Sequence, residues 1–352
     1  MVLGGLSAGG AEKWVTDFVA LEQNGYSYDI IALSSKGQFF YPSCPVYFSE
    51  TKNPITHFLY LYRFVSAQPS IKVIHCHLNY SNWILCLIGF LLRRKVVAHW
   101  HNDTRFKEIA SSFFRRLYFF LSRFFISISA DSIICVSKNA EASFLKGTLM
   151  SLVKDKCSVI FCGTTEFYPR YILPEIELNK KLRVVHFGRF VEQKNHVRVI
   201  EIFARIRELS RGSKLYLFGD GPLQSDVRRL ANDLGLQADV FFEGNVSNVK
   251  EKMYSGADVF LLPSLHEGLP IVCMEAQAVG LPMILSTEVS GEIEHPTLTR
   301  FVSLTESNYV WAKAVVDIAH ISNSRQSCIE EFSSSIFNLK NGAGSVREHY
   351  EG

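Results

Sequence analysis

The sequence predicts an α/β protein of two domains, each built on a parallel sheet with helices on both faces. Short, β-branched apolar runs alternate along the chain with longer amphipathic stretches. Strands that are apolar throughout are typical of parallel sheets buried on both sides. The 352 residues also favour two domains, since a common domain has roughly 150. The alternation pauses at about 164–182, where a polar stretch with Pro174 separates the two series.

We therefore predict an N-terminal domain at 1–165, a linker at 166–182, a C-terminal domain at 183–325 and a C-terminal helical segment at 326–352 that can pack back on the first domain. The predicted strands are 71–75, 95–98 and 132–136 in the first sheet, and 183–187, 214–218, 240–243, 258–262 and 282–285 in the second. The predicted helices are 10–24, 81–92, 108–128, 195–210, 223–234, 270–280 and 338–350. Only Val2 and Leu3 precede a first glycine loop, so the first strand is either short or begins before this sequence does.

Composition indicates a protein of a reduced compartment without a membrane-spanning segment. The eight cysteines form no C-x-x-C pair, and several lie in apolar runs. That placement suits buried thiols better than disulfides or zinc ligands. No signal peptide is recognisable, and the longest apolar run, 83–92, has 10 residues, about half of what a spanning helix needs. We expect a cytoplasmic protein.

The net charge of +3 conceals an asymmetry between the two halves. Residues 1–165 carry 17 Lys/Arg and 10 Asp/Glu, whereas the remainder carries 20 and 24. Within 93–125, basic residues are mixed with large aromatic ones, a combination that suits an anionic membrane surface. The alternative is a core helix at 112–128 with solvated arginines. Nucleic acid is not an expected partner, since no recognised binding motif accompanies the charge.

The segment 254–282 carries the most information about function. A buried strand is followed by a loop with Glu267, and Pro270 suits the first turn of a helix because it has no N–H to lose. The helix N-terminus would then point into the crevice at the carboxyl ends of the strands, where free amides bind anions or sugar oxygens. Glu275, further along the helix, gives a second carboxylate, so that a sugar and a ribose can each be bound. The alternative is two unrelated glutamates.

Two cations, Arg189 and Lys194, follow another predicted strand. A nucleotide diphosphate that leaves during a reaction needs positive charge where its negative charge develops, and arginine and lysine supply it in complementary ways. The alternative is a solvated pair at a helix start. Gly9 and Gly10 likewise precede a helix, as in loops whose backbone approaches a phosphate or sugar, although a Gly-Gly pair also suits a plain turn.

These segments resemble glycosyltransferase family 4, which contains retaining enzymes of the GT-B fold, with two Rossmann-like domains facing a central cleft. The similar segments follow the family's order at 9–12, 99–102, 130–138, 185–196, 218–223, 241–246 and 254–282. The resemblance spans about residues 3–290. Two segments depart from the family pattern: the turn at 162–165 lacks an aspartate, and 287–292 replaces a Gly-Gly-x-x-Glu loop. The exact donor contacts are therefore not carried over.

The resemblance implies roles for individual residues. It makes His101, Glu267, Arg189 and Lys194 catalytic, with His101 beside the donor sugar. The alternative for a histidine in this setting is a structural role, which we expect for His75, His77 and His99. The implied donor-binding residues are Gly9, Gly10, Arg189, Lys194, Gly219, Gly221, Glu267, Gly268, Leu269, Ile271 and Glu275. The resemblance implies no metal ligand and no cofactor. The implied donor substrate is a nucleotide-diphosphate sugar.

The segments 98–102 and 287–292 resemble the branch of the family that serves bacterial capsule or exopolysaccharide assembly. The resemblance implies a retaining, metal-independent hexosyltransferase that acts on a lipid-linked oligosaccharide or glycan at the inner face of the cell membrane. Two other functions remain open: a GT-B epimerase of nucleotide sugars, and a non-catalytic partner that binds a nucleotide or a lipid carrier.

Overall fold

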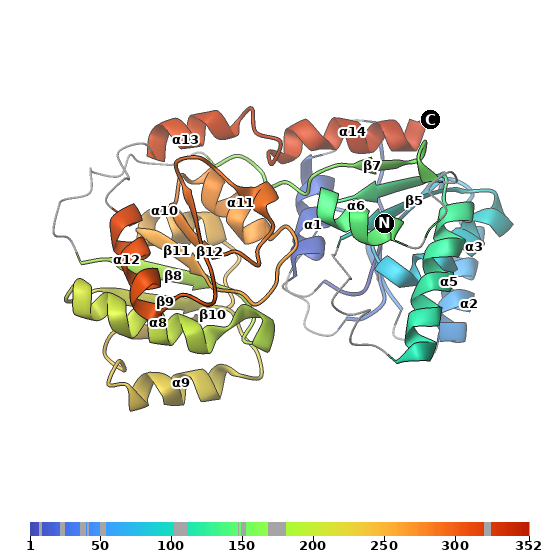
Figure 1. Ribbon diagram of the computed structural model, residues 1–352. Coiled ribbons are helices and arrows are strands. Elements are labelled where there is room, and N and C mark those ends of the chain that lie inside the picture. Colours follow the sequence, from blue (N-terminus) through green and yellow to red (C-terminus); the bar gives the residue numbers. More distant parts are fainter. Residues whose placement is uncertain are drawn as a thin grey trace. The chain divides into compact units, whose positions relative to one another are not determined.

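The computed structural model consists of two compact units, labelled by element in Figure 1. Unit 1 comprises Met1–Gly163 and Leu339–Gly352, and unit 2 comprises Thr164–Asn338. The C-terminal segment predicted at 326–352 is thus divided between the units. The structure describes residues 1–6, 9–21, 25–35, 40, 42–49, 54–101, 112–146, 148, 153–167, 181–319 and 325–351. Most of the predicted linker at 166–182 lies outside the described residues.

Unit 1 is built on a seven-stranded parallel sheet with the order β3-β2-β1-β4-β5-β6-β7. Its strands are β1 Val2–Leu3, β2 Ile30–Ala32, β3 Val46–Phe48, β4 Val73–Cys76, β5 Lys95–Trp100, β6 Ser132–Cys135 and β7 Cys157–Val159. The three predicted strands are β4, β5 and β6, which are almost wholly buried. The sequence analysis missed β2, β3 and β7, because three residues are too few to show a period.

The helices of unit 1 are α1 Gly10–Leu21, α2 Pro54–Ser66, η1 Asn79–Ser81, α3 Asn82–Leu92, α5 Phe113–Ser129, α6 Lys138–Leu145 and α14 Leu339–Glu351. Local chemistry sets several of their ends. Ser137 begins α6 by accepting a hydrogen bond from the Ala140 amide at 3.0 Å. Arg93 ends α3 in the left-handed conformation and turns the chain into β5. No helix in the described parts of the chain combines the length and the apolar character that crossing a bilayer requires.

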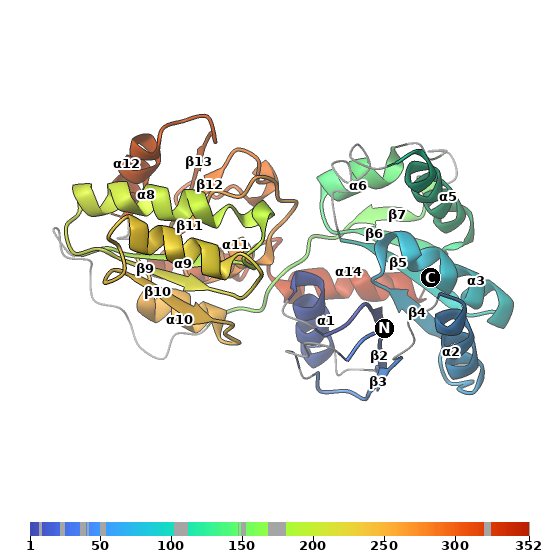
Figure 2. The ribbon, with the colours of Figure 1, turned by 90° about the horizontal axis from the view of Figure 1, so that it is seen from below.

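The C-terminal helix α14 belongs to unit 1, although unit 2 separates it from the rest of that unit in sequence (Figure 2). The Tyr350 hydroxyl lies 2.6 Å from Nδ1 of His75 on β4. The His349 ring lies between the hydroxyls of Ser132 and Ser158, on β6 and β7, with Nε2 2.8 Å from Ser158. These bonds hold α14 against three strands of the unit 1 sheet.

Unit 2 is built on a six-stranded parallel sheet with the order β10-β9-β8-β11-β12-β13. Its strands are β8 Arg183–Phe187, β9 Lys214–Phe218, β10 Val240–Gly244, β11 Val259–Leu262, β12 Met283–Ser286 and β13 Thr299–Val302. Five of the six match the predicted strands to within one residue at each end. The two units therefore both have the Rossmann-like architecture that the sequence predicts.

The helices of unit 2 are η2 Glu192–Lys194, α8 His196–Leu209, α9 Gln224–Asp233, α10 Val249–Gly256, α11 Ile271–Ala278, η3 Gly291–Ile293, α12 Asn308–Ala319 and α13 Arg325–Phe332. The core of the unit forms where α8 and α12 pack on the sheet and on each other. Phe203 of α8 and Trp311 of α12 are fully buried there against Leu215 and Leu261 of the strands. Burial of such large side chains stabilises the sheet. The loops at the carboxyl edge of this sheet carry the candidate site residues of unit 2.

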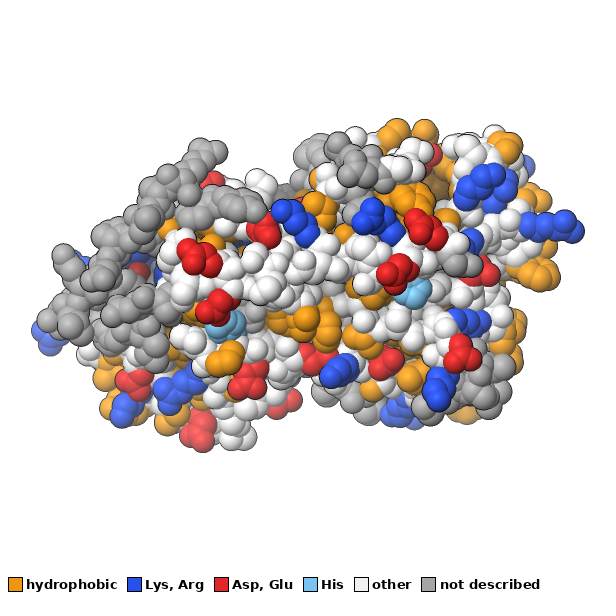
Figure 3. All heavy atoms as spheres, turned by 90° about the horizontal axis from the view of Figure 1, so that it is seen from above, with side chains coloured by type: hydrophobic (Ala, Val, Ile, Leu, Met, Phe, Trp, Pro, Cys, Tyr) orange, Lys and Arg blue, Asp and Glu red, His pale blue; other side chains and the backbone are white. Residues whose placement is uncertain are grey.

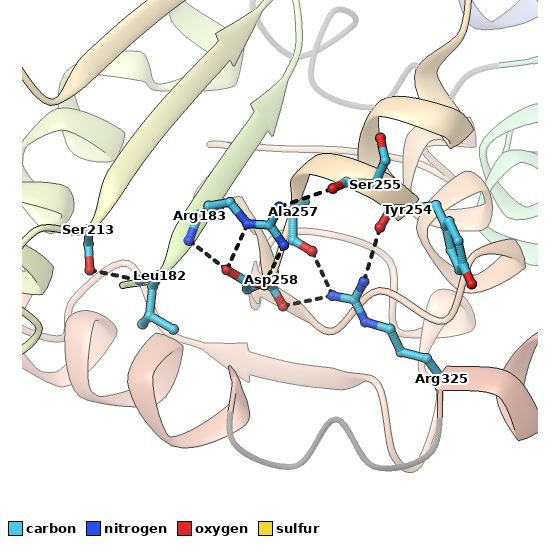
Figure 4. A network of polar contacts seen from close by, with 8 residues as sticks. All are labelled: Leu182, Arg183, Ser213, Tyr254, Ser255, Ala257, Asp258 and Arg325. Atoms are coloured by element: carbon cyan, nitrogen blue, oxygen red, sulfur yellow. Dashed lines mark hydrogen bonds and ion pairs between the residues drawn. The ribbon is translucent and has the colours of Figure 1, made fainter. Parts of the chain in front are cut away.

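A network of charged groups closes the amino edge of this sheet (Figure 4). The Asp258 carboxylate accepts from the Arg183 backbone N–H at 2.8 Å and from its guanidinium at 3.0 Å. Arg183 also donates to the Ser255 carbonyl at 3.0 Å, and Arg325 donates to the Ala257 carbonyl at 2.8 Å. Burial lowers the pKa of Arg325 to about 10, which leaves it charged. The network joins β8, β11, α10 and α13, and the loops at the carboxyl edge remain separate from it.

Candidate active site

Three loops of unit 2 meet at the carboxyl edge of its sheet. Arg189 and Lys194 follow β8, Gly219 and Gly221 follow β9, and Glu267 follows β11. Because neighbouring parallel strands end at the same edge, their loops are neighbours there. The structure thus gathers at one edge the residues that the sequence singled out in this half of the chain.

Hydrogen bonds from backbone and amide groups join the loops after β8 and β11. The Leu265 N–H donates to the Gln193 carbonyl at 2.9 Å, and the Gln193 side chain donates to the His266 carbonyl at 2.9 Å. The Asn195 side chain donates to the Pro263 carbonyl at 3.0 Å, while Asn195 itself is left-handed at the start of α8. Sequence reasoning missed Gln193 and Asn195 as positioning residues. Their amide side chains between a strand and a helix gave only a weak signal.

These bonds bring Lys194 and Glu267 into direct contact. Nζ of Lys194 lies 2.5 Å from a carboxylate oxygen of Glu267, and the two side chains are only 17% and 9% exposed. Water has little access to this ion pair. If the pair separated, neither charge could be fully hydrated, so the two side chains stay together. The Glu267 N–H is itself bonded to the Glu288 carbonyl at 3.1 Å, which fixes the backbone that carries the carboxylate.

The N-terminus of α11 lies directly after this pair. Pro270, the residue before the helix, is extended and gives no side-chain oxygen to the helix amides. Within the described part of the chain, the amides of Gly268 and Leu269 make no hydrogen bond either. With the first helix amide, on Ile271, they form a row of free donors at the positive end of a helix dipole. Glu275 lies within the same helix and is 4% exposed.

The glycines after β9 are required by a close approach of two backbones. A Cβ on Gly219, whose φ is +132°, would lie 2.1 Å from the Gly188 carbonyl oxygen. A Cβ on Gly221 would lie 2.6 Å from the Phe190 carbonyl oxygen. The two glycines thus let their turn support the loop that carries Arg189. Arg189 itself is exposed, and its side chain contacts no carboxylate among the residues that the structure describes.

Two buried histidines, which the sequence analysis did not single out, lie beneath this loop. His186 donates through Nδ1 to the Leu261 carbonyl at 2.8 Å, and His196 stacks on Phe190 with ring centroids 3.9 Å apart. Burial lowers the pKa of His186 to about 4 and that of His196 to about 2. Both rings are therefore neutral near pH 7, and the positive charge of this edge comes from Lys194 and Arg189.

His101, the predicted catalytic histidine, lies in unit 1 directly after β5. Its Nε2 is 2.7 Å from Nδ1 of His77, and its Nδ1 is 3.9 Å from Sγ of Cys162. Its backbone N–H donates to the Asn79 side chain at 3.1 Å. Desolvation lowers the pKa of His101 to about 4. Both ring nitrogens thus face protein groups, so contact with a ligand would require the ring to give up one of these partners.

His101 is one end of a stack of four histidines that also contains His75, His77 and His99. Nε2 of His75 lies 3.0 Å from Nδ1 of His99, and the Trp14 ring packs against the edges of the stack. Burial and the mutual repulsion of the rings keep the pKa of the other three histidines well below the ordinary value. All four rings are therefore neutral near pH 7, and they are hydrogen-bonded in two pairs, His75 with His99 and His77 with His101.

Some of these side chains lie close enough together to be considered as metal ligands. The candidate sets among the described residues are His75, His77 and His99; His99, His101 and Cys162; and His295, Cys328 and Glu331. In the set of His99, His101 and Cys162, the two rings are stacked with an interplanar angle of 17° and centroids 4.4 Å apart. Their lone pairs consequently run parallel and do not converge on one point, as metal coordination requires. The arrangement suits a hydrogen-bonded stack.

Gly9 and Gly10 lie at the start of α1 in unit 1. α1 begins at Gly10, and the Gly9 carbonyl accepts from the Lys13 N–H at 3.0 Å. The atoms nearest to a Cβ on Gly9 would be those of the flexible Glu12 carboxylate. The two glycines therefore open a helix at the carboxyl edge of the unit 1 sheet, after β1.

Comparison with known protein families covers both units. The family model described as Glycosyltransferase Family 4 matches residues 8–165, and the model described as Glycosyl transferases group 1 matches residues 173–332. Together they cover about nine-tenths of the chain, in the order in which the two units follow each other. The chain belongs to glycosyltransferase family 4. The resemblance on which the residue roles rest is thereby confirmed.

Two curated relatives match this glycosyltransferase over most of its length. EpsF of Bacillus subtilis (strain 168), whose own assignment as a glycosyltransferase is provisional, is 28% identical over 94% of this chain and 90% of that protein. The N-acetylgalactosamine-N,N'-diacetylbacillosaminyl-diphospho-undecaprenol 4-alpha-N-acetylgalactosaminyltransferase of Campylobacter jejuni is 24% identical over 82% of this chain and 80% of that protein. Relatives thus include an enzyme whose acceptor is a lipid diphosphate.

The fold of the glycosyltransferase is also that of solved structures. Anabaena HepE, determined with UDP and with UDP-glucose, superposes with a TM-score of 0.75 and 16% identity, over 99% of this chain and 98% of that one. At this identity the likeness establishes the GT-B fold and nothing about individual residues. The fold class predicted from the sequence is confirmed.

Proposed function

We propose that this glycosyltransferase moves a hexosyl group from a nucleotide-diphosphate sugar to a lipid-linked glycan during assembly of a bacterial surface polysaccharide. The observation that carries the donor assignment is the carboxyl edge of unit 2, where the loop after β8 carries Arg189 and Lys194, Lys194 contacts Glu267, and open amides follow Glu267 at the start of α11. A diphosphate and a sugar require this combination of donors. The structures of HepE in complex with UDP and with UDP-glucose support the same class of donor.

In this proposal, Arg189 and Lys194 bind the diphosphate. Arg189 is exposed and able to place its planar guanidinium against phosphate oxygens. The Lys194 ammonium has three N–H donors, so it can turn toward a phosphate as its bond to Glu267 weakens. Glu267 accepts from hydroxyls of the donor sugar, and Glu275 accepts from the ribose.

The remaining donor contacts are proposed for backbone groups. The free amides of Gly268, Leu269 and Ile271 bind sugar or phosphate oxygens. Gly219 and Gly221 border the base, on the turn that supports the Arg189 loop. In unit 1, Gly9 and Gly10 would approach the donor through their backbone, and His101 would bind the sugar once its ring leaves His77 or Cys162.

We propose transfer with retention and without a metal ion. The bond between C1 of the sugar and the diphosphate oxygen breaks, and its electron pair leaves with the diphosphate. The acceptor hydroxyl forms a new bond to C1 on the same face and gives its proton to the departing phosphate. Positive charge from Arg189 and Lys194 stabilises the charge that develops there. NMR of the product linkage tests this stereochemistry, and an inverted linkage would contradict it. Full activity after removal of divalent cations by EDTA is expected.

A lipid-linked acceptor is supported by the Campylobacter relative, whose name specifies an undecaprenyl diphosphate substrate. Such an acceptor lies in a bilayer, so the enzyme would work at the cytoplasmic face of the cell membrane as a peripheral protein. The predicted membrane-facing segment, 93–125, lies in unit 1, and residues 102–111 of it are outside the described residues.

The donor is tested by thermal shift with UDP-, GDP-, ADP- and dTDP-sugars on the wild type and on Arg189→Ala. One nucleotide should raise the melting temperature with increasing concentration, because ligand binding stabilises the folded state. The rise should be smaller in Arg189→Ala and unchanged in Arg211→Ala, an exposed arginine on the turn before β9. No rise with any of the four sugars would refute the donor assignment. Equal rises in all three proteins would refute the role of Arg189.

A further inference from the structure

The helix α5 reverses the usual pattern of a surface helix. Its buried side is formed by Phe119, Ser122, Arg123, Ile126 and Ser127, three of which are polar. Its exposed side carries an apolar stripe at helical spacing, formed by Phe114, Leu117, Leu121, Phe125 and Ile128. A helix that faces water normally has the opposite arrangement. The stripe therefore indicates a surface that meets something other than water.

The stripe continues onto α3, which packs beside α5. Phe90 of α3 is 75% exposed, and Phe113 and Phe114 at the start of α5 are 73% and 80% exposed. We call this surface the apolar face; it comprises Leu87, Phe90, Leu91, Phe113, Phe114, Leu117, Leu121, Phe125 and Ile128. Neither helix contains an aspartate or a glutamate. The face thus spans two helices that pack on each other and that carry no negative charge.

Basic residues border the apolar face. Arg93, Arg94 and Lys95 follow α3 without interruption, and Arg115 and Arg116 are exposed in the first turn of α5. In the space-filling view, Lys and Arg side chains lie among hydrophobic ones at the end of unit 1 where α3 and α5 are found (Figure 3). Apolar side chains that would enter a bilayer, next to cations that would meet phosphates, are the pattern of proteins that bind an anionic membrane surface.

A hollow of about 1020 Å³ lies beside the apolar face, at the amino end of β5. Phe90, Leu91, Arg93, Arg94 and Lys95 line one side of it. The half-buried Arg94 thus lies between the fold and the hollow, with its Nε buried and without an acceptor among the described residues. We call this hollow the basic pocket. His101 lies beyond the other end of β5, so the pocket is distinct from the proposed sugar contacts of unit 1.

Two acidic residues also line the basic pocket, Asp131 and Glu348. The Asp131 carboxylate accepts from the Val96 N–H at 2.7 Å and is thereby engaged within the fold. Glu348 is exposed at the end of α14. Three cations against two carboxylates, one of them engaged, leave the pocket positive. An anion with several acceptor oxygens would satisfy Arg93, Arg94 and Lys95 together.

We propose that the apolar face enters an anionic phospholipid bilayer and that the basic pocket binds the phosphate of a lipid headgroup there. This inference rests on the proposed function, since a lipid-linked acceptor requires the enzyme at a membrane, and it names the surface that would hold it there. The occupant is lipid because the cations and the exposed aromatic residues adjoin each other on one surface. In one bilayer, the cations would contact the headgroup phosphates and the aromatic side chains would enter the apolar layer below them.

The proposal is tested by co-sedimentation of the full chain with vesicles of phosphatidylcholine alone and with added phosphatidylglycerol. Binding should require the anionic lipid and weaken with salt. Arg93→Gln/Arg94→Gln should lower the partition constant about 25-fold, or about fivefold per cation. Phe113→Ser/Phe114→Ser should also abolish most binding. The matched controls are Tyr309→Ser/Val310→Ser, an exposed apolar pair on α12, and Arg211→Gln, and neither should change it.

Equal binding to neutral vesicles, or an undiminished partition constant in Arg93→Gln/Arg94→Gln, would overturn the headgroup site. Absence of binding to any vesicle would overturn the proposal as a whole. So would self-association of the chain that Phe113→Ser/Phe114→Ser abolishes, because the face would then join two copies. The thermal shift with nucleotide sugars should be the same in all these variants. A failure of membrane binding is thus distinguishable from a failure of the donor assignment.

Discussion

Removal of one charge from the pair formed by Lys194 and Glu267 is predicted to destabilise unit 2 in an asymmetric way. The two side chains are 17% and 9% exposed and 2.5 Å apart. Breaking a buried pair costs about 3–5 kcal/mol, and the residual exposure of Lys194 places the cost of Glu267→Gln at the lower end, about 3 kcal/mol. Lys194→Met should cost less, because the Glu267 carboxylate that remains lies just before α11, whose dipole favours negative charge.

The assay is urea unfolding followed by fluorine NMR of the chain labelled with 5-fluorotryptophan. Trp311 is the single tryptophan of unit 2 and is fully buried, so its signal follows that unit alone. Lys194→Met/Glu267→Gln should recover part of the loss, with a coupling free energy of about 1–3 kcal/mol. Asp226→Asn is the matched control. Its ion pair with Arg229 is exposed and should contribute less than about 1 kcal/mol. A coupling near zero, or equal costs in the two single variants, would refute the reasoning.

Two further predictions concern the histidine stack and the turn after β9. The free energy of unfolding of unit 1 should fall as pH decreases from 6.5 to about 4, because buried neutral His101 binds its proton only near pH 4 whereas the unfolded chain binds it near 6.5. Each such histidine contributes at most about 1.4 kcal/mol per pH unit. His101→Gln should flatten the slope measured by urea unfolding, and an unchanged slope would contradict it. Gly219→Ala should weaken donor binding and cost more stability than Gly235→Ala, whose Cβ would meet no atom within 4 Å although its φ is also positive, at +66°. Equal costs would show that φ alone matters there.

The sequence predicted the parts of the fold that depend on long apolar runs. The central strands of both sheets were found because full burial makes them apolar throughout. The short strands β2, β3 and β7 were not found, since a three-residue strand is defined by its pairing partners and carries little pattern of its own. The sequence analysis did predict a C-terminal segment that packs back on the first domain. It could not predict the bonds that fix α14 there, because Tyr350 and His349 bond to strands nearly 200 or more residues away.

The sequence was enough to name candidate residues for the site, and it could not give the contacts between them. Arg189, Lys194 and Glu267 were named from strand ends and from family resemblance. Their positions along parallel strands then place them at one edge. The bond between Lys194 and Glu267 depends on the conformation of two loops, which Gln193 and Asn195 fix through single hydrogen bonds. No periodicity encodes such bonds. The contacts of His101 with His77 and Cys162 were invisible for the same reason.

The pair of Lys194 and Glu267 also bears on how a donor would be selected. In the structure each charge neutralises the other, and the free amides of α11 lie beside them. A diphosphate that approaches Lys194 competes with the carboxylate for the ammonium. As the bond between Lys194 and Glu267 weakens, the carboxylate oxygens become available to sugar hydroxyls. Contact with the phosphate and contact with the sugar are then coupled through one ion pair. A nucleotide diphosphate that lacks the sugar would leave Glu267 without its new partner, and it should bind less tightly than the complete donor.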